Sequence, residues 1–230
     1  MVAPTVVFDL DGTLVDSAPD LVATLNVIFA RNGLPPLTYD VARNMVGGGA
    51  RAMIGHGLAA EGRTLEEAEV DRLVRDFIDY YAAHIADHSR PFPGLDAALD
   101  ELAAAGCRLA VCTNKLEWLS LRLLDAFALS KRFVAICGAD TFGLRKPDPE
   151  LLRLTLARAG GSPDRAVMVG DSLNDIATAR AAGVPVVAVD YGYTETPVGE
   201  LGPDRVIGAL SELPEAIFDI LGSPARVEPR

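Results

Sequence analysis

Two aspartates at the end of an apolar segment are the first candidates for chemistry in this sequence. Thr5-Val6-Val7-Phe8 runs directly into Asp9-Leu10-Asp11-Gly12-Thr13. Carboxylates two positions apart at a glycine turn repel each other without a cation, and oxygen ligands favour a hard cation such as Mg²⁺. Taken alone, the segment is also compatible with a solvated acidic turn. It therefore predicts either a metal-binding, reactive turn or an ordinary surface turn.

A second acidic segment, Gly170-Asp171-Ser172-Leu173-Asn174-Asp175, follows another apolar run at residues 165–169. Asp171 would end a strand, and Asp175 would lie one helical turn later on the same face. In a parallel sheet the carboxyl ends of strands share one edge, so both acidic segments would line one crevice. Four clustered carboxylates are costly unless a metal is bound, which predicts metal ligands among Asp9, Asp11, Asp171 and Asp175. Helix capping by Asp171 or Ser172 is the alternative, and it is compatible with metal binding.

Two further segments offer groups that could bind an anion. Thr113 and Asn114 end the apolar run 108–113, and Lys146 precedes the helix signal Asp148-Pro149. A lysine at a helix N-terminus opposes the helix dipole, so its position makes sense if an anion is bound nearby. Helix capping by Thr113 and a solvated surface position for Lys146 are the competing interpretations. Only three of the 21 basic residues are lysines, Lys115, Lys131 and Lys146, which suggests a specific use for them.

The elements that would position these residues alternate between strand and helix. The predicted strands are short and rich in valine, without clean polar alternation, as expected of strands buried on both faces: residues 5–8, 108–113, 132–137, 165–169 and 185–189. Helical segments lie between them, at 95–105, from Pro149, and at 172–182, with Gly106 and Gly183 placed as left-handed helix ends. The fold class is therefore α/β, with a doubly wound, Rossmann-like, mostly parallel sheet.

The segment from Pro19 to about His88 contains helices and no strand. One predicted helix buries Leu21, Leu25, Ile28 and Phe29; a second has apolar residues at helical spacing from Val70 to Tyr81. Thr64-Leu65-Glu66-Glu67 has the form of a capping box that would start the second helix. We expect a helical cap domain at 16–91, a catalytic core at 1–15 and 92–222, hinges at 15–19 and 89–94, and a disordered tail at 223–230.

Composition excludes several classes of function. The chain has 230 residues, of which 50% are hydrophobic, and a formal net charge of −11. An acidic chain is a poor candidate for nucleic-acid binding, and no apolar run is long enough to cross a bilayer. The N-terminus lacks the pattern of a signal peptide, and Cys107, Cys112 and Cys137 form no C-x-x-C pair. We expect a cytoplasmic protein with buried free cysteines, no nucleic-acid or membrane partner, and an oligomeric state that the sequence leaves open.

The sequence contains four motifs, each at a strand end or loop, in the order D-x-D-G-T, T-N, K-P and G-D-S-x-x-D. Together they resemble the motifs of the phosphatase branch of the haloacid dehalogenase superfamily. The motifs span Asp9 to Asp175. The resemblance implies that Asp9 is the nucleophile, and that Asp11 is the general acid and then the base. It implies an Mg²⁺ cofactor held by Asp9, the Asp11 carbonyl and Asp171, with Asp175 in support. The phosphate-binding residues would be Gly12, Thr13, Thr113, Asn114 and Lys146. Dehalogenases lack an acid at the position of Asp11, so dehalogenation is not expected.

The cap residues suggest a substrate. Gly47-Gly48-Gly49-Ala50-Arg51-Ala52 formally satisfies a G-x-G-x-x-A dinucleotide pattern, but it lacks a preceding parallel strand, so a flexible cap loop is favoured. Gly48 would allow a close backbone approach, and Arg51, or alternatively Arg43, could pair with a substrate carboxylate. Four further segments resemble bacterial phosphoglycolate phosphatases: 16–21, 46–49, 89–94 and 113–115. The expected partner is a small phosphorylated metabolite, with 2-phosphoglycolate the specific prediction.

Other functions remain open at this point. Sister phosphatases act on sugar phosphates or pyrophosphate, and a sugar-phosphate mutase would also need Asp9 and Asp11. Release of free phosphate would distinguish a phosphatase from a mutase. A non-catalytic phospho-acceptor would lack both the cap and an acid such as Asp11. A binding module with a dead site is disfavoured by the complete motif set.

Overall fold

A six-stranded parallel sheet forms the centre of the molecule in the computed structural model, which describes residues 3–222. All five neighbouring strand pairs are parallel. The strands in spatial order are β5 (Ala135–Cys137), β4 (Arg108–Cys112), β1 (Thr5–Phe8), β6 (Ala166–Gly170), β7 (Val186–Val189) and β8 (Arg205–Ile207). The predicted doubly wound α/β class is confirmed.

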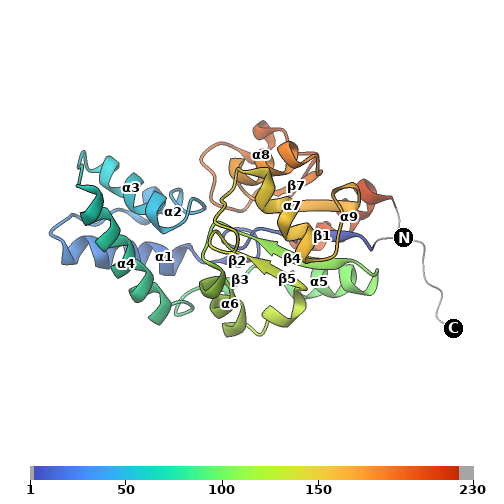
Figure 1. Cartoon of the computed structure of the whole chain (residues 1–230), viewed down its shortest axis with the longest axis horizontal. Helices are drawn as coiled ribbons and strands as arrows, with labels where there is room; N and C mark the ends of the chain where they lie inside the picture. Colours follow the sequence, from blue (N-terminus) through green and yellow to red (C-terminus); the bar gives the residue numbers. More distant parts are fainter. Residues whose placement is uncertain (1–2, 223–230) are drawn as a thin grey trace.

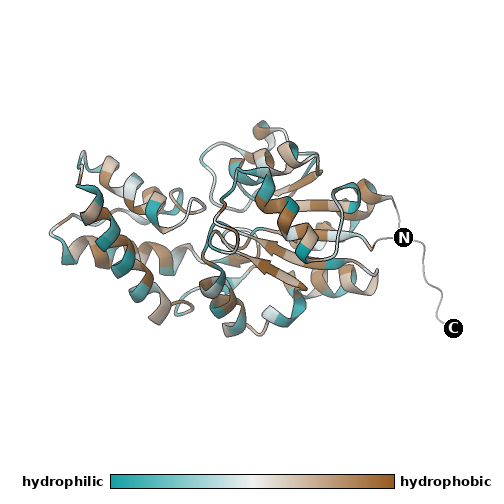
Figure 2. Ribbon diagram, in the orientation of Figure 1, coloured by the Kyte–Doolittle hydropathy of each residue, from teal (hydrophilic) through white to brown (hydrophobic). Residues whose placement is uncertain are grey.

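Helices cover both faces of this sheet (Figure 1). One face carries α5 (Leu95–Ala104), α6 (Glu117–Ala126) and α9 (Leu213–Leu221), and the other carries α7 (Pro149–Arg158) and α8 (Leu173–Ala182). Along β1, Val6 and Phe8 pack in the first layer and Val7 in the second. Since both faces are buried, the strands are hydrophobic along most of their length (Figure 2), which explains their lack of polar alternation.

Four helices lie to one side of the sheet and form an insertion in the chain between β2 (Val15–Asp16) and β3 (Arg90–Pro91) (Figure 1). They are α1 (Ala18–Arg31), α2 (Tyr39–Arg43), α3 (Ala50–Ala60) and α4 (Glu67–Ala83). The buried face of α1 contains the four residues predicted for it, Leu21, Leu25, Ile28 and Phe29. On α4 the buried residues are Leu73, Phe77 and Tyr81, also at the predicted helical spacing. Helix α4 packs against both α1 and α3.

Two chain crossings join these helices to the core. Strands β2 and β3 pair antiparallel there. The buried carboxylate of Asp20 accepts hydrogen bonds from the His88 amide at 3.0 Å, and from the Ser89 amide at 2.8 Å and hydroxyl at 2.6 Å. The predicted boundaries at 15/16 and 91/92 fall at this ribbon. The hinges predicted at 15–19 and 89–94, about which the cap would move as a unit, stay a prediction.

Some local predictions differ from the structure. The capping box of α4 is formed by Glu66 and Glu69, so the prediction based on Thr64 is wrong by two residues. Leu65 and Val70 then occupy the positions of a hydrophobic staple, and both pack against the core, which favours this later start. Strand β8 was not predicted, and β5 begins only at Ala135 because residues 130–132 form a 3₁₀ turn.

The expectations for the helix ends and for the cysteines are confirmed. Gly106 and Gly183 adopt positive φ at their helix ends, and Asp148 caps α7 through the Glu150 amide at 2.9 Å. All three cysteines are free and buried. Within residues 3–222, no helix is long and apolar enough to cross a membrane. The predicted disordered tail at 223–230 lies outside the described residues.

The Asp20 contacts generate a stability prediction. We expect Asp20→Ala to lower the free energy of unfolding by about 1–3 kcal/mol, because buried donors at residues 88 and 89 lose their acceptor. Asp79→Ala, at an exposed α4 position, is the matched control and should change stability by less than about 0.5 kcal/mol. Urea unfolding followed by circular dichroism would measure both. Equal stabilities for the two variants would contradict the structural role of Asp20.

Candidate active site

The strand register brings the separate motifs to one edge of the sheet. Phe8, the last residue of β1, lies opposite Val111 on β4 and Val169 on β6. Asp9 therefore begins at the same level as the ends of both neighbours, and its amide donates to the Val169 carbonyl at 2.8 Å. The chain order reverses at β1, with β4 and β5 on one side and β6, β7 and β8 on the other. Such a switch point is where α/β sheets bind ligands.

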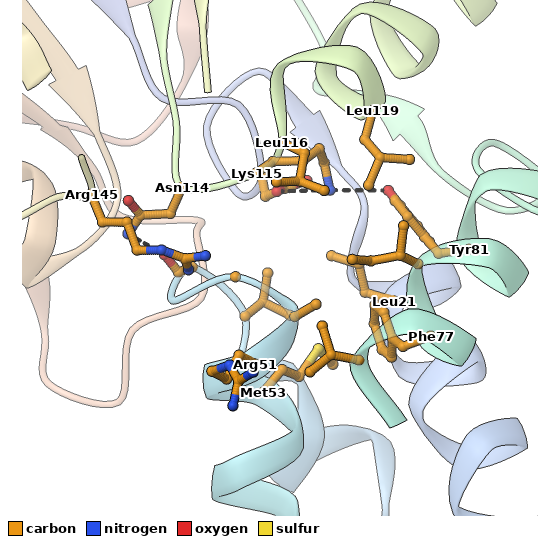
Figure 3. Close-up of a pocket in the computed structure, with 17 residues that line it drawn as sticks. Leu21, Arg51, Met53, Phe77, Tyr81, Asn114, Lys115, Leu116, Leu119 and Arg145 are labelled. Carbon is orange, nitrogen blue, oxygen red and sulfur yellow. Dashed lines mark hydrogen bonds and ion pairs between the residues drawn. The ribbon is translucent and has the colours of Figure 1, made fainter. Parts of the chain in front are cut away.

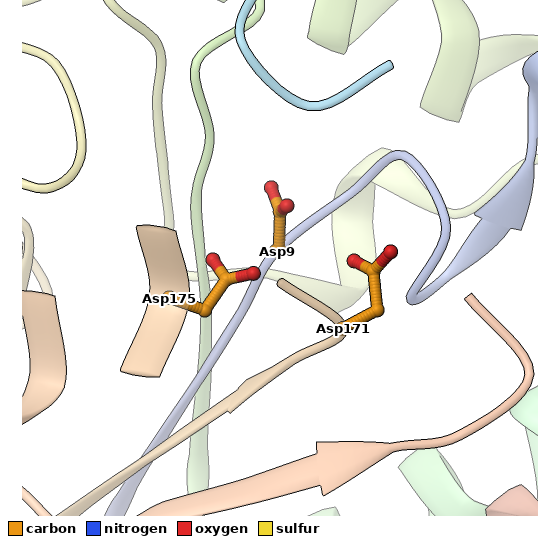
Figure 4. A group of neighbouring side chains, drawn as sticks. All are labelled: Asp9, Asp171 and Asp175. Carbon is orange, nitrogen blue, oxygen red and sulfur yellow. The ribbon is translucent and has the colours of Figure 1, made fainter. Parts of the chain in front are cut away.

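Three buried carboxylates face one another at this point (Figure 4). Asp9, Asp171 and Asp175 each offer an oxygen, and these oxygens lie within 4.8 Å of one another. Asp9 Oδ1 has no hydrogen-bond partner in proper geometry among the described residues. Buried like charges are costly unless cations offset them, so the cluster could hold a metal ion, and its oxygen-only donor set suits a hard one.

Lys146 supplies the positive charge that the sequence suggested. Its Nζ lies 2.8 Å from Asp9 Oδ1 and 2.6 Å from Asp175 Oδ1, and the side chain is buried. Burial by itself would lower the pKa of Lys146, but the carboxylates of Asp175 and Asp9 outweigh it and raise that pKa. Lys146 is therefore a permanent cation beside Asp9. The alternative of a solvated surface lysine is wrong.

Asp171 and Asp175 are fixed by neighbouring polar groups. Asp171 accepts from the Thr13 hydroxyl at 3.0 Å and from the Tyr193 amide at 2.8 Å. Asp175 Oδ2 accepts from the Ser172 amide and hydroxyl, at 3.0 and 2.6 Å, as part of a capping box. Helix capping and a place in the cluster thus coexist, and Asp175 has both oxygens engaged.

Gly12 makes room for Asp171. Its φ is +83°, and an added Cβ would lie 2.4 Å from Asp171 Oδ2. A side chain at this position would meet both an unfavourable backbone conformation and a direct clash. The turn that Gly12 allows also directs Thr13 toward Asp171, so its observed role is to shape the carboxylate cluster.

The carboxylate of Asp11 points away from this cluster. Its Oδ1 accepts from the Ser17 hydroxyl at 2.5 Å, and its Oδ2 lies 3.0 Å from Lys115 Nζ. The side chain of Asp11 is therefore not among the clustered oxygens, so only its backbone carbonyl remains a predicted metal ligand. Asp9 and Asp11 face different surroundings, as two carboxylates with different roles would.

Asn114 holds two parts of the site together. Its side-chain oxygen accepts from the Lys146 amide at 2.8 Å, and its nitrogen donates to the Lys146 carbonyl at 3.2 Å and the Gly47 carbonyl at 3.1 Å. Since these bonds occupy the amide, the structure supports a positioning role for Asn114. Thr113 is buried beside it, and its hydroxyl accepts from the Lys115 amide. Direct phosphate binding by Thr113 and Asn114 stays a prediction.

A pocket of about 320 Å³ lies between the helical insertion and the core (Figure 3). Asp11, Asn114, Lys115 and Arg145 line its core side. The other side is mainly apolar: Leu21, Val46, Met53, Val74, Phe77 and Ile78. The helix face of α4 predicted to be core is thus partly a pocket wall.

The predicted cap residues have mixed outcomes. Gly47 and Gly49 line the pocket, and the Gly48 carbonyl lies 3.5 Å from the Arg145 guanidinium. Helix α2, not a strand, precedes this loop, which excludes the dinucleotide frame. Arg51 lines the pocket, but its guanidinium contacts Asp71, and Glu67 at 3.9 Å.

Arg43, the alternative to Arg51, donates to the carbonyls of Tyr191 and Gly192 in the core. It is therefore a link between cap and core in this structure, and it does not line the pocket.

Sequence reasoning did not assign Lys115 to the site. Its ammonium is buried at the pocket, beside Asp11 and the Tyr81 hydroxyl at 3.2 Å. The signal available in the sequence was the rarity of lysine, since two of the three lysines are buried here while Lys131 is exposed.

The fold and the site define a doubly wound α/β protein with buried aspartates and a lysine at the carboxyl edge of its sheet, a site suited to an anionic ligand. Comparison with known proteins agrees. Residues 6–189 match the family model described as haloacid dehalogenase-like hydrolase. The chain belongs to this family, and it is a phosphoric monoester hydrolase.

Individual relatives are similar over nearly the whole chain. A phosphoglycolate phosphatase from Caulobacter vibrioides is 52% identical, over 95% of this chain and 92% of its own. An N-acetylmuramic acid 6-phosphate phosphatase from Pseudomonas aeruginosa is 36% identical, over 94% and 93%. The crystal structure of a predicted phosphoglycolate phosphatase from Haemophilus somnus matches with a TM-score of 0.87 and 30% identity, over 93% of this chain and 97% of that one.

The carboxylate cluster generates a prediction about metal and pH. Without a metal, burial and then the charges of Asp175 and Asp9 raise the pKa of Asp171 to about 8. Burial raises the pKa of Asp9 to about 7, although Lys146 opposes the shift. Between pH 4 and 8 the native state then binds more protons than the unfolded state, so the stability of the metal-free protein should fall as pH rises.

We expect Mg²⁺ to restore this stability, because a cation bound to the ionised cluster would stabilise the native state alone. We expect a larger increase in Tm on adding Mg²⁺ at pH 8 than at pH 6, with about 2–4 °C for each kcal/mol. Asp171→Asn should lose most of the response, while Asp219→Asn, at an exposed ion pair, should keep it. An undiminished Mg²⁺ response in Asp171→Asn would remove Asp171 from the metal site.

Proposed function

We propose that this enzyme is an Mg²⁺-dependent phosphatase that forms an aspartyl-phosphate, an acyl phosphate, on Asp9. The observation that carries the proposal is the position of Asp9 Oδ1, a buried oxygen without a hydrogen-bond donor in proper geometry, beside the fixed cation Lys146. An anionic nucleophile and an anionic phosphate repel each other, and a buried ammonium offsets this repulsion in the transition state. Asp11, directed to the pocket side, is placed to exchange a proton with the leaving group.

In the first step, a carboxylate oxygen of Asp9 attacks phosphorus, and the bond from phosphorus to the ester oxygen breaks. Protonated Asp11 gives its proton to that oxygen, so the alcohol leaves neutral. Lys146 stays charged throughout and pairs with the phosphoryl oxygens, assisted by Thr113. Because the groups are already fixed by the surrounding hydrogen bonds, little reorganisation is needed.

In the second step, water attacks the phosphorus of the aspartyl-phosphate, and the bond between phosphorus and the Asp9 oxygen breaks. Asp11, now a carboxylate, takes a proton from the attacking water, which restores both aspartates. A bound Mg²⁺, held by Asp9, Asp171 and the Asp11 carbonyl with Asp175 in support, would supply further neutralisation of phosphate charge.

The proposed substrate is 2-phosphoglycolate, hydrolysed to glycolate and phosphate. The Caulobacter relative with this named activity supports it, because similarity at 52% identity extends over both the core and the cap. The pocket is also consistent with a small acid. Its lining includes Asp11 and three cations, Lys115, Arg51 and Arg145.

The pocket also supports a second candidate, a phosphate ester with a larger organic group. A volume of about 320 Å³ and an apolar wall on α1, α3 and α4 offer more room and more hydrophobic surface than a two-carbon acid uses. The Pseudomonas relative named for N-acetylmuramic acid 6-phosphate shows that a larger substrate is compatible with a closely similar chain.

The Asp9 assignment gives a direct prediction. Asp9→Asn should reduce kcat by at least about 10³-fold with the fold intact, because an amide cannot serve as the nucleophile. Activity would be followed as phosphate release, and the fold by circular dichroism. Mass spectrometry of acid-quenched wild type should find phosphate on the peptide containing Asp9. Phosphate on a different residue, or near-normal turnover of the purified variant, would sink the assignment.

The substrate assignment is tested with a panel. We expect 2-phosphoglycolate to have a higher kcat/KM than glucose 6-phosphate, N-acetylmuramic acid 6-phosphate and pyrophosphate. Arg51→Ala tests the sequence-based cap contact: a fall of about tenfold in kcat/KM for 2-phosphoglycolate would indicate that Arg51 leaves Asp71 to bind the carboxylate. Arg63→Ala, at an exposed cap position, is the control. If another compound is best, the phosphatase stands and the substrate is reassigned.

A further inference from the structure

We propose that Lys115 binds the carboxylate of the substrate, so that this lysine selects esters whose carboxylate is attached to the carbon next to the ester oxygen. The inference rests on the proposed phosphatase function and deepens it. It differs from the sequence-based assignment of the carboxylate to Arg51.

The first support is the position of Lys115. It lies on the loop between β4 and α6, two residues after Thr113, and its side chain is only 5% exposed. Its Nζ lies 3.0 Å from Asp11 Oδ2, 3.2 Å from the Tyr81 hydroxyl and 4.5 Å from the centre of the Tyr81 ring. Figure 3 shows the ammonium at the edge of the pocket, directed at Tyr81. A ligand that contacts Lys115 would therefore lie in the pocket between the core and the cap.

The second support is the donor capacity of Lys115. An ammonium has three N–H donors, and a buried one needs polar partners. Within residues 3–222, the side-chain groups at hydrogen-bond distance from Lys115 Nζ are the Asp11 carboxylate at 3.0 Å and the Tyr81 hydroxyl at 3.2 Å. A carboxylate on the substrate would accept the third N–H and add a second negative charge beside the ammonium.

The third support is distance. Asp11 donates its proton to the ester oxygen, so that oxygen must lie at hydrogen-bond distance from the Asp11 carboxylate. In 2-phosphoglycolate, one methylene separates this oxygen from the carboxylate. Since Lys115 Nζ is itself 3.0 Å from Asp11, a carboxylate placed one carbon beyond the ester oxygen falls within its reach.

The other two pocket cations are less suited to the task. Arg51 is exposed, is already paired with Asp71, and lies across the pocket from Lys115 in Figure 3. Arg145 is also exposed and contacts the Gly48 carbonyl. Charge-assisted hydrogen bonds are stronger where water is excluded, which favours the buried Lys115.

The test compares 2-phosphoglycolate with ethyl phosphate, in which a methyl group replaces the carboxylate. The measured quantity is the ratio of their kcat/KM values in wild type, Lys115→Met, Arg51→Met and Lys131→Met. Wild type should favour 2-phosphoglycolate, and Lys115→Met should lower the ratio by about 10- to 100-fold. Lys131→Met, at an exposed lysine, is the control for loss of charge and should leave the ratio unchanged. Arg51→Met should change the ratio less than Lys115→Met does.

A binding measurement covers the case in which Lys115→Met turns over too slowly. In the Asp9→Asn background, the increase in Tm on adding 2-phosphoglycolate with Mg²⁺ should fall when Lys115→Gln is introduced, while the increase with ethyl phosphate should not. Parallel losses for both compounds would overturn the inference and make Lys115 a positioning residue for Asp11, with the phosphatase function intact. A wild-type enzyme that does not distinguish the two compounds would overturn both the inference and the proposed substrate.

Discussion

Repulsion among three buried carboxylates is the constraint on which the rest of this structure depends. Asp9, Asp171 and Asp175 lie within 4.8 Å of one another at the end of the sheet, and such a cluster would be expelled from a protein interior without compensation. Lys146 provides part of that compensation, at 2.8 Å from Asp9 and 2.6 Å from Asp175. Three carboxylates against one ammonium leave an excess of negative charge, so the cluster could hold a metal ion.

Polar contacts near these carboxylates also connect the helical insertion to the core. Asp11 is turned out of the cluster toward Ser17 and Lys115, and Lys115 in turn contacts Tyr81 of the cap. A side chain of α4 therefore lies within hydrogen-bond distance of the lysine that neighbours the proposed general acid. Arg43 and the Gly47 carbonyl make further contacts between the helical insertion and the core.

Local signals in the sequence were sufficient for most elements. Strands buried on both faces leave a continuous apolar run, and helix ends leave Asp148 or Gly183, so both were predicted to within a few residues. The errors arose where competing local signals were close together. The capping box moved from Thr64 to Glu66 because burial of Leu65 outweighed the local pattern, and the three-residue strand β8 has too little sequence to be recognised.

The sequence by itself determined the family motifs and their order. It also indicated that each motif follows a strand or precedes a helix, as do Asp9, Thr113, Lys146 and Asp171. Their meeting at one edge was predicted from a general property of parallel sheets. Only the tertiary structure decided which way each side chain faces: Asp11 away from the other carboxylates, Asn114 into the Lys146 backbone, and Lys115 into the pocket. These directions depend on partners that are distant in the chain, such as Tyr81 for Lys115, and spacing along the sequence carries no information about them.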